Sequence, residues 1–379
     1  MSMRYFAKHL FDGTQFKNDC LIQVNDNHIV GVTSGTQKQA DIVLDGTVAP
    51  GFIDVQVNGG GGELFNNAPT LQTLVAMSTA HQRYGTTSMM PTVITDNLDV
   101  MQQAANGMQQ ALAQNLPGIV GIHFEGPHLS VPKKGIHPDN HIRQISDAEL
   151  AIYTRKDIGK VQMTVAPETV PPAVIKQLVA EGVIVSLGHS NATAAQTLEA
   201  LEAGATGFTH LFNAMSSVTG REAGMLGLAL LNNDAFCGLI VDGEHVGKES
   251  CQLALKCKSA QKIMLVTDAM SHVGSEQSEL TFAGMTITKN GNKLTIDNGR
   301  LAGSALDMAS AVCNTVNDLH ISLAEALIMA SSTPATFLSL QHKKGYIQAG
   351  FDADWVTLSD DLQVTSTFIA GNCVYKNNN

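Results

Sequence analysis

From Gly51 onward the chain repeats one unit, a short apolar and β-branched run followed by a stretch with helical periodicity. This repeat is typical of parallel βα units. The apolar runs lie at 51–57, 86–93, 118–125, 161–167, 183–189, 207–212, 235–241 and 262–267. Eight such strands predict a closed (β/α)8 barrel of the TIM type in an α/β protein, and we assign it residues 51–344.

Helix signals between these strands favour the same fold. Leu71 and Leu74 begin an apolar face that ends before Gly85, as expected for a helix between two strands. The segments 146–149 and 322–325 both have the Ser-x-x-Glu spacing of a capping box, and they predict the starts of two further helices.

Both ends of the chain alternate polar and apolar residues in the manner of strands. We expect residues 1–50 and 345–379 to form one small β-sandwich domain beside the barrel. Residues 280–301 alternate as well, with turn signals at Asn290-Gly291 and at 297–299. They predict a hairpin insertion that covers the barrel mouth.

The net charge of −11 opposes binding to DNA or to anionic membranes, so we expect neither as a partner. The start of the chain has no signal-peptide core, and no later run has the roughly 18 apolar residues of a membrane span. A cytoplasmic protein is therefore expected. Six cysteines without Cys-x-x-Cys spacing favour reduced and mostly buried thiols, although Cys251 and Cys257 leave a weak metal signal.

Three metal-competent side chains stand where apolar runs end, namely Glu125, His189 and His210. The carboxyl ends of barrel strands meet at one mouth, so these side chains can converge. A lone histidine at such a place is more often a hydrogen-bonded core residue. Three at three different strand ends favour one divalent ion, with water in the fourth position.

Asp268 ends the eighth strand, where a carboxylate needs a partner. It is either a structural aspartate bound to backbone N–H groups or a general base that serves a hydrolytic metal site. Gln56 and Asn58 share one face of the first strand and are expected to point into the pocket. Neutral amides are poor ligands for a second zinc, and the strand at 161–167 contains no lysine that could bridge two ions.

Several loops carry residues suited to a phosphate. The run Gly59–Gly62 lacks the Gly-Lys-Ser/Thr ending of a phosphate loop, and we expect it to provide loop flexibility. Cationic candidates on the mouth side lie in 133–137 and at Arg143, Arg221 and His245. Solvated surface charge is the alternative for each of them.

The chain resembles the amidohydrolase superfamily over nearly its whole length. The resemblance rests on these motifs: Gly51-Phe-Ile-Asp-Val-Gln-Val-Asn-Gly, His123-Phe-Glu-Gly-Pro-His, Gly188-His-Ser, Thr209-His-Leu-Phe-Asn-Ala-Met, Asp242-Gly-Glu-His, Val266-Thr-Asp-Ala and Ala349-Gly-Phe-Asp-Ala-Asp-Trp-Val. It implies a metal-dependent hydrolase, and most closely one that removes the acetyl group from a phosphorylated amino sugar in amino-sugar catabolism.

The resemblance also implies roles for individual residues. Glu125, His189 and His210 match the metal ligands, Asp268 the catalytic acid/base, and His137 the group that polarises the acetyl carbonyl. The residues that match substrate contacts are Ile136, Asn213, Ala214, Arg221, Asp242, Gly243, Glu244, His245, Leu301, Ala302 and Gly303. Among these, Arg221 and His245 match phosphate binders. The arginine can reach in from a neighbouring subunit, so a homodimer or homotetramer is implied.

This chain departs from many superfamily members because Gln56-x-Asn58 replaces a His-x-His pair on the first strand. That difference matches the branch with one metal ion. We expect zinc, although iron, cobalt, manganese and nickel accept the same ligands. Two other functions stay open: hydrolysis of another amide, such as an N-acyl amino acid or a cyclic imide, and a non-catalytic oligomeric scaffold.

Overall fold

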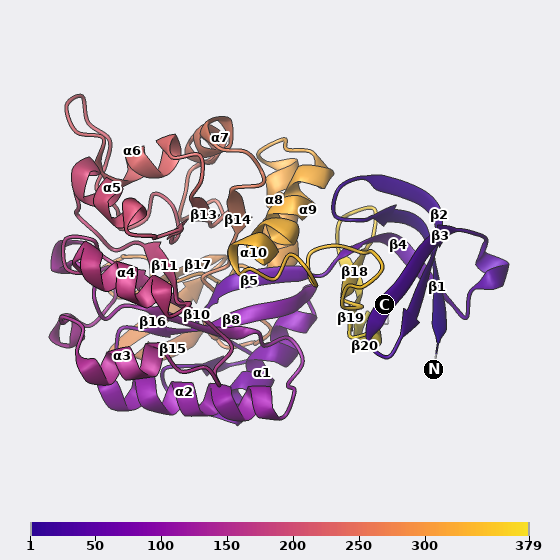
Figure 1. Cartoon of the computed structure of the whole chain (residues 1–379), viewed down its shortest axis with the longest axis horizontal. Coiled ribbons are helices and arrows are strands. Elements are labelled where there is room, and N and C mark those ends of the chain that lie inside the picture. Colours follow the sequence, from indigo (N-terminus) through magenta and orange to yellow (C-terminus); the bar gives the residue numbers. More distant parts are fainter. Residues whose placement is uncertain (1, 378–379) are drawn as a thin grey trace.

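The computed structural model describes residues 2–377 and contains two parts, a barrel and a smaller β domain. In Figure 1 the barrel with its surrounding helices lies on the left, and the small domain, which contains both chain ends, lies on the right. The helices α8 and α9, drawn in orange, lie on the side of the barrel that faces the small domain.

Eight parallel strands form the barrel. They are β5 (Phe52–Val57), β8 (Thr86–Ile94), β9 (Gly121–Glu125), β10 (Lys160–Val165), β11 (Ile184–Leu187), β12 (Gly207–Phe208), β13 (Phe236–Leu239) and β14 (Ile263–Leu265). Each strand pairs with the next along the chain, and a parallel bridge between Val57 and Ala269 links the first strand to the segment after the last. The predicted barrel is confirmed, so the carboxyl ends of its strands share one mouth.

Helices follow the strands as the sequence predicts. They are α1 (Leu71–Gln82), α2 (Leu98–Ala113), α3 (Asp147–Tyr153), α4 (Pro172–Ala180), α5 (Ala194–Glu202), α6 (Gly224–Leu231), α7 (Lys248–Cys257), α8 (Met308–Asn317), α9 (Leu323–Ala330) and α10 (Ser332–Phe337). The capping box at 146–149 begins α3, and the Ser322 hydroxyl accepts a hydrogen bond from the Glu325 amide at the start of α9.

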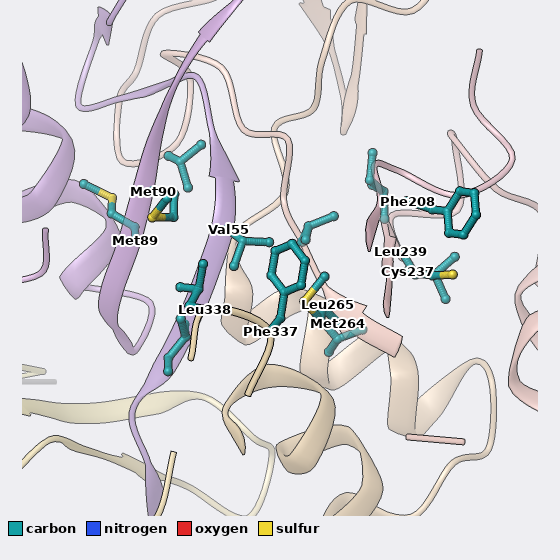
Figure 2. Packing of buried hydrophobic residues seen from close by; sticks show 14 of the residues in the cluster. Val55, Met89, Met90, Phe208, Cys237, Leu239, Met264, Leu265, Phe337 and Leu338 are labelled. Atoms are coloured by element: carbon teal, nitrogen blue, oxygen red, sulfur yellow. The ribbon is translucent and has the colours of Figure 1, made fainter. Parts of the chain in front are cut away.

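The last of these helices closes part of the amino-terminal end of the barrel. Figure 2 shows the Phe337 ring of α10 between Val55 of β5 and Met264 of β14. The ring also lies 5.6 Å from that of Phe236 in β13. Phe337 is buried, so α10 supplies an apolar plug beneath this side of the barrel.

The small domain is one seven-stranded sheet. Its strands are β1 (Met3–Phe11), β2 (Phe16–Asn25), β3 (His28–Ser34), β4 (Ile42–Pro50), β18 (Trp355–Leu358), β19 (Val364–Ile369) and β20 (Asn372–Lys376). Strands from the two chain ends meet where β18 pairs with β4. Trp355 packs edge-on against Tyr5 and stacks on Phe368, so residues far apart in sequence share one core.

The insertion after the barrel differs from the expected hairpin. It forms three antiparallel strands, β15 (Glu279–Phe282), β16 (Met285–Asn290) and β17 (Lys293–Thr295). The turn after Asn290 was predicted, but the turn at Ala283-Gly284 was not. Its two residues have φ values of 48° and 77°, and alanine gives no sequence signal for such a conformation.

The glycine run 59–62 is ordered by packing, which corrects the expectation of a flexible loop. It contains β6 (Gly59–Gly60), which pairs with β7 (Glu63–Leu64) in a tight hairpin. A Cβ atom on Gly59 would lie 2.4 Å from the Glu63 carbonyl oxygen, and Gly61 and Gly62 have φ values of 64° and 89°. The glycines therefore allow close approach and a left-handed turn.

Within residues 2–377, none of the helices combines the length and the apolar character that crossing a bilayer requires. Three of the six cysteines, at 20, 237 and 251, are buried.

Candidate metal and catalytic site

Glu125, His189 and His210 come together at the barrel mouth. Glu125 is the last residue of β9, and the two histidines follow β11 and β12 by two residues each. The Nε2 atom of His210 lies 3.0 Å from Glu125 Oε1 and 2.9 Å from His189 Nε2. His189 Nε2 lies 3.4 Å from the same carboxylate oxygen. All three side chains are buried.

The donor set of these residues suits a divalent cation. His189 Nδ1 lies 2.9 Å from the Lys133 carbonyl and must donate to it, so its Nε2 carries a lone pair directed at the other two ligand atoms. Converging lone pairs in a buried site repel one another unless a cation lies between them. Tetrahedral zinc with bonds of about 2.0 Å places its ligand atoms roughly 3.3 Å apart, close to the separations here.

The pKa of Glu125 agrees with this arrangement. Burial alone would raise it, but the close contacts of the carboxylate with the His189 and His210 rings outweigh burial and hold the pKa well below its usual range. The carboxylate is therefore ionised and able to ligate a metal at neutral pH.

Left-handed backbone conformations direct several of these side chains. His189, His210 and Asp268 have φ values of 47°, 29° and 53°, and Ala214 has a φ of 51°. Such values are uncommon for residues other than glycine and cost free energy, so they persist where surrounding packing fixes them. The chain turns sharply at each strand end, which brings the polar side chain over the barrel axis.

Asp268 lies beside the three-residue cluster and is held by two amides. Asn58 Nδ2 donates to Asp268 Oδ1 at 2.7 Å, and Gln56 Nε2 donates to the same oxygen at 3.1 Å. Gln56 Nε2 also lies 3.0 Å from Glu125 Oε1, so it links the two carboxylates. Both amides point into the site, as their spacing on the first strand suggested. Burial, followed by the nearby Glu125 charge, raises the pKa of Asp268.

His137 faces the same cluster from the loop after β9. Its ring centroid is 4.3 Å from that of His189, and its Nε2 lies 4.0 Å from Glu125 Oε2. Its Nδ1 lies 2.8 Å from the Thr95 hydroxyl. Burial, followed by the nearby His189, holds the pKa of His137 well below its ordinary value, so the ring is neutral. A neutral ring with Nδ1 facing a hydroxyl can carry its proton on Nε2.

These groups line a cavity of about 210 Å³ that contains many of the predicted site residues. The predicted residues around it are Glu125, Ile136, His137, His189, His210, Asn213, Ala214, His245, Asp268, Leu301 and Gly303. Five predicted residues, Arg221, Asp242, Gly243, Glu244 and Ala302, are not part of its lining.

Asp242 does not line the cavity but holds His245, which does. Its Oδ1 accepts hydrogen bonds from the amides of Glu244 and His245, and its Oδ2 lies 2.6 Å from His245 Nδ1. This pattern fixes the loop and the orientation of the His245 ring, and His245 itself lines the cavity. Glu244 instead faces outward and pairs with Lys293 at 3.2 Å.

Two predicted phosphate candidates lie elsewhere in the single chain. Arg221 is exposed in the loop before α6. Arg143 donates to Glu149 Oε1 at 2.7 Å and to the carbonyls of Asp96 and His141, which corrects its assignment to the site. Arg143 is occupied by structural contacts because α3 begins beside it.

The cavity also contains residues that the sequence did not single out: Ile94, Gly135, Met270 and Arg300. Arg300 precedes Leu301 at the end of the insertion, and its Nη1 donates to the Gly135 carbonyl at 3.0 Å. The only sequence signal for Arg300 was its place next to Leu301, a predicted substrate contact. It could not be distinguished from an ordinary exposed arginine.

A buried polar layer lies beneath the site. His123 Nε2 is 2.7 Å from the Thr164 hydroxyl, which is 2.6 Å from that of Thr209. Burial lowers the pKa of His123 to about 4, so this histidine is neutral. Because His123 and Thr209 are close along the chain to Glu125 and His210, the layer supports two of the three clustered residues from below.

Comparisons with known proteins agree with this geometry. The sequence model of the amidohydrolase family matches residues 47–374. An N-acetylgalactosamine-6-phosphate deacetylase from Shewanella sp. (strain ANA-3) is 48% identical over 376 residues, which cover 98% of this chain and 95% of the relative.

Two solved structures are similar over almost the whole chain. The N-acetylglucosamine-6-phosphate deacetylase from Pasteurella multocida has a TM-score of 0.95, 33% identity and full coverage of both chains. A mutant of the corresponding enzyme from Mycobacterium smegmatis, in complex with N-acetyl-D-glucosamine-6-phosphate, has a TM-score of 0.91 and 29% identity, and covers 99% of this chain and 100% of that one.

Proposed function

The chain belongs to the amidohydrolase family, and on that premise we propose that it hydrolyses the acetamide of N-acetyl-D-glucosamine 6-phosphate. The products are D-glucosamine 6-phosphate and acetate. The observation that carries this proposal is the position of Asp268, a carboxylate held by Asn58 and Gln56 beside the Glu125, His189 and His210 cluster. Metal-dependent amide hydrolysis requires a metal-competent cluster next to an acid/base group that is not itself a metal ligand.

Glu125, His189 and His210 would hold one divalent cation, for which we propose zinc. Iron(II), cobalt, manganese and nickel accept the same ligands. When bound, such an ion supplies Lewis acidity that lowers the pKa of water and polarises a carbonyl.

Asp268 moves the protons of the reaction. Its carboxylate removes a proton from the attacking water as the new C–O bond forms at the acetyl carbon. It then returns that proton to the nitrogen as the C–N bond breaks, which releases the amine and acetate. Two amide donors on Oδ1 fix the carboxylate and leave Oδ2 for this exchange.

His137 stabilises the negative charge that develops on the carbonyl oxygen. When the Thr95 hydroxyl donates to Nδ1 at 2.8 Å, in place of the longer 3.3 Å contact with the Glu125 carbonyl, the neutral ring presents an Nε2–H group toward the cluster. A donor fixed in a buried site contributes to catalysis because it needs no rearrangement during the reaction.

The sugar phosphate requires positive charge at the edge of the cavity. His245 and Arg300 line it within one chain. We propose that Arg221 completes the phosphate site from a neighbouring subunit of a homodimer or homotetramer, because its loop is exposed and lies apart from the cavity of its own chain. The remaining substrate contacts would come from Ile136, Asn213, Ala214 and 301–303.

A second candidate substrate is the C4 epimer, N-acetyl-D-galactosamine 6-phosphate. The relative from Shewanella sp., at 48% identity, is named as a deacetylase of that epimer. Both substrates carry the same acetamide and the same phosphate, so the metal cluster, Asp268 and His137 would serve either one.

The test is acetate release by the purified metal-loaded protein from four substrates: N-acetylglucosamine and N-acetylgalactosamine, each with and without the 6-phosphate. We expect kcat/KM to be higher for both phosphorylated sugars than for the plain ones, and the better epimer identifies the substrate. Equal values with and without phosphate would contradict the proposal. An N-acyl amino acid serves as a comparison substrate, and its faster hydrolysis would contradict the proposal as well.

A further inference from the structure

A second cavity lies at the opposite end of the barrel from the metal cluster. Its volume is about 560 Å³, and its lining includes the starts of β8 and β10 and the residues just before β9 and β11. Leu340 and the lysines at 343 and 344, which follow α10, close one side together with Ile369 of the small domain. The cavity therefore opens between the barrel floor and the β domain, on the side that Phe337 does not fill.

Five cationic side chains surround this cavity, namely Arg155, Lys156, Lys160, Lys343 and Lys344, against one acidic residue, Glu181. Such a concentration of positive charge is unexpected in a chain with a net charge of −11.

Three of the five cations are already paired. Arg155 binds Asp157, Lys156 binds Glu181, and Lys344 binds Asp352 and Asp354. Lys160 and Lys343 have no carboxylate partner anywhere in residues 2–377, yet they line the same space. Burial, followed by the charge of Lys343, lowers the pKa of Lys160, so the two ammonium groups repel each other.

We propose that this cavity binds a small phosphate-bearing anion between Lys160 and Lys343. The inference does not depend on the proposed deacetylation, because none of these residues lines the metal cavity.

A phosphate group suits these donors better than a carboxylate does. Near neutral pH a phosphate group carries more than one negative charge, which matches two unpaired ammonium groups, whereas a carboxylate carries only one. The cavity is large enough to hold an organic remainder as well as the phosphate, so free phosphate and a sugar phosphate are both possible sources of the same chemistry.

The test measures the acetylation rate of individual lysines by an N-hydroxysuccinimide ester, followed by mass spectrometry, on the metal-loaded protein. Inorganic phosphate is compared with sodium chloride at equal ionic strength. We expect saturating phosphate to slow acetylation of Lys160 and Lys343 at least about fivefold, because an occupied site shields both amines. Lys176, an exposed lysine on α4 outside the cavity, is the internal control.

A matched pair of variants locates the site. In Lys343→Gln, the phosphate concentration that half-protects Lys160 should rise about tenfold, because one charged donor is lost. Lys176→Gln should leave it unchanged. Repeating the titration with glucose 6-phosphate separates the sources, since the anion that protects at the lower concentration is the better ligand. Lys160 acetylation that is as fast in phosphate as in chloride would overturn the proposal.

Discussion

The Asp268 carboxylate lies beside three metal-competent side chains without being one of them. Its partners are amides, which donate hydrogen bonds and carry no charge that could hold it in a fixed ion pair. Burial and the Glu125 charge raise its pKa, which makes it a stronger base than an exposed aspartate. These properties suit proton transfer rather than structural support.

Replacing this group tests its role. In Asp268→Asn, we expect kcat for acetate release to fall about 100-fold to 10,000-fold, the usual range for loss of a general acid or base. Metal content should stay near the wild-type value because Glu125, His189 and His210 are untouched. Metal analysis and steady-state kinetics on the same preparation check both points, and a kcat within threefold of wild type would exclude this role.

Asp54 gives a residue-level prediction for stability against pH. It is fully buried and accepts a hydrogen bond from the Thr267 hydroxyl, and burial raises its pKa to about 7 from 3.8. The folded protein thus holds a proton on Asp54 between pH 4 and 7 that the unfolded chain has released. This contribution to stability is present at pH 4 and is lost as the pH rises toward 7.

The variant Asp54→Asn should remove that dependence. The free energy of unfolding of wild type, relative to the variant, should fall with rising pH by up to about 1.4 kcal/mol per unit in this window. Urea denaturation at several pH values measures the difference. A constant difference between the two proteins from pH 4 to 7 would contradict the raised pKa.

Residue identities at the site were largely predictable, but their conformations were not. Glu125, His189, His210 and Asp268 could be found because each interrupts an apolar strand pattern at its end. Their left-handed φ values follow from tertiary packing and have no counterpart in the sequence of a histidine or an aspartate. Arg300 was missed because an exposed arginine in a turn has no distinguishing pattern.

Among the elements, α10 determines how the barrel is closed from below. Its Phe337 reaches the barrel floor beside β13, where the start of β12 is a glycine. A Cβ atom at Gly207 would lie 2.9 Å from the Phe337 ring, so a larger residue there would displace the plug.

Removing the plug should destabilise the fold. For Phe337→Ala we expect a loss of about 3–5 kcal/mol in the free energy of unfolding, as is typical of a buried phenylalanine. Leu231→Ala is the matched control, because Leu231 on α6 is 71% exposed and should change stability by no more than about 0.5 kcal/mol. Denaturant unfolding of both variants measures these losses. Similar losses in the free energy of unfolding for the two variants would contradict the role of Phe337 in closing the barrel.

The strands were the easiest elements to predict, because each barrel strand is a short apolar run bounded by turn residues. The insertion was harder, since the Ala283-Gly284 turn has only one glycine and lies between residues of mixed polarity. The glycine run 59–62 was assigned to a flexible loop because sequence cannot show that the Glu63 backbone lies against it.

At the scale of the whole molecule, we propose that the site for the phosphate group of the substrate, at the edge of the metal cavity, needs two subunits. Arg221 lies on an exposed loop before α6 and does not line the cavity of its own chain. Neither the sequence nor one folded chain contains the position of a neighbouring subunit, so this part of the proposal rests on the family resemblance together with the exposed position of the Arg221 loop. Symmetric assembly can place the same loop of each subunit beside its partner's site.

Mixing two inactive variants tests this arrangement. Arg221→Gln and Asp268→Asn should each have low activity, but mixed dimers would contain one site with both native residues. After the subunits are exchanged by mild denaturation and refolding, a one-to-one mixture should reach about a quarter of wild-type activity. If the mixture stays at the mean of the two variants, Arg221 acts within its own chain or does not act in the site.

The central claim is that catalysis depends on one divalent ion held by Glu125, His189 and His210. Its most direct test is to strip the protein with a chelator, add zinc back in known amounts, and follow acetate release against bound metal. We predict negligible activity without metal and a linear rise that stops at one equivalent per chain. Activity that survives metal removal, or that keeps rising to two equivalents, would contradict it.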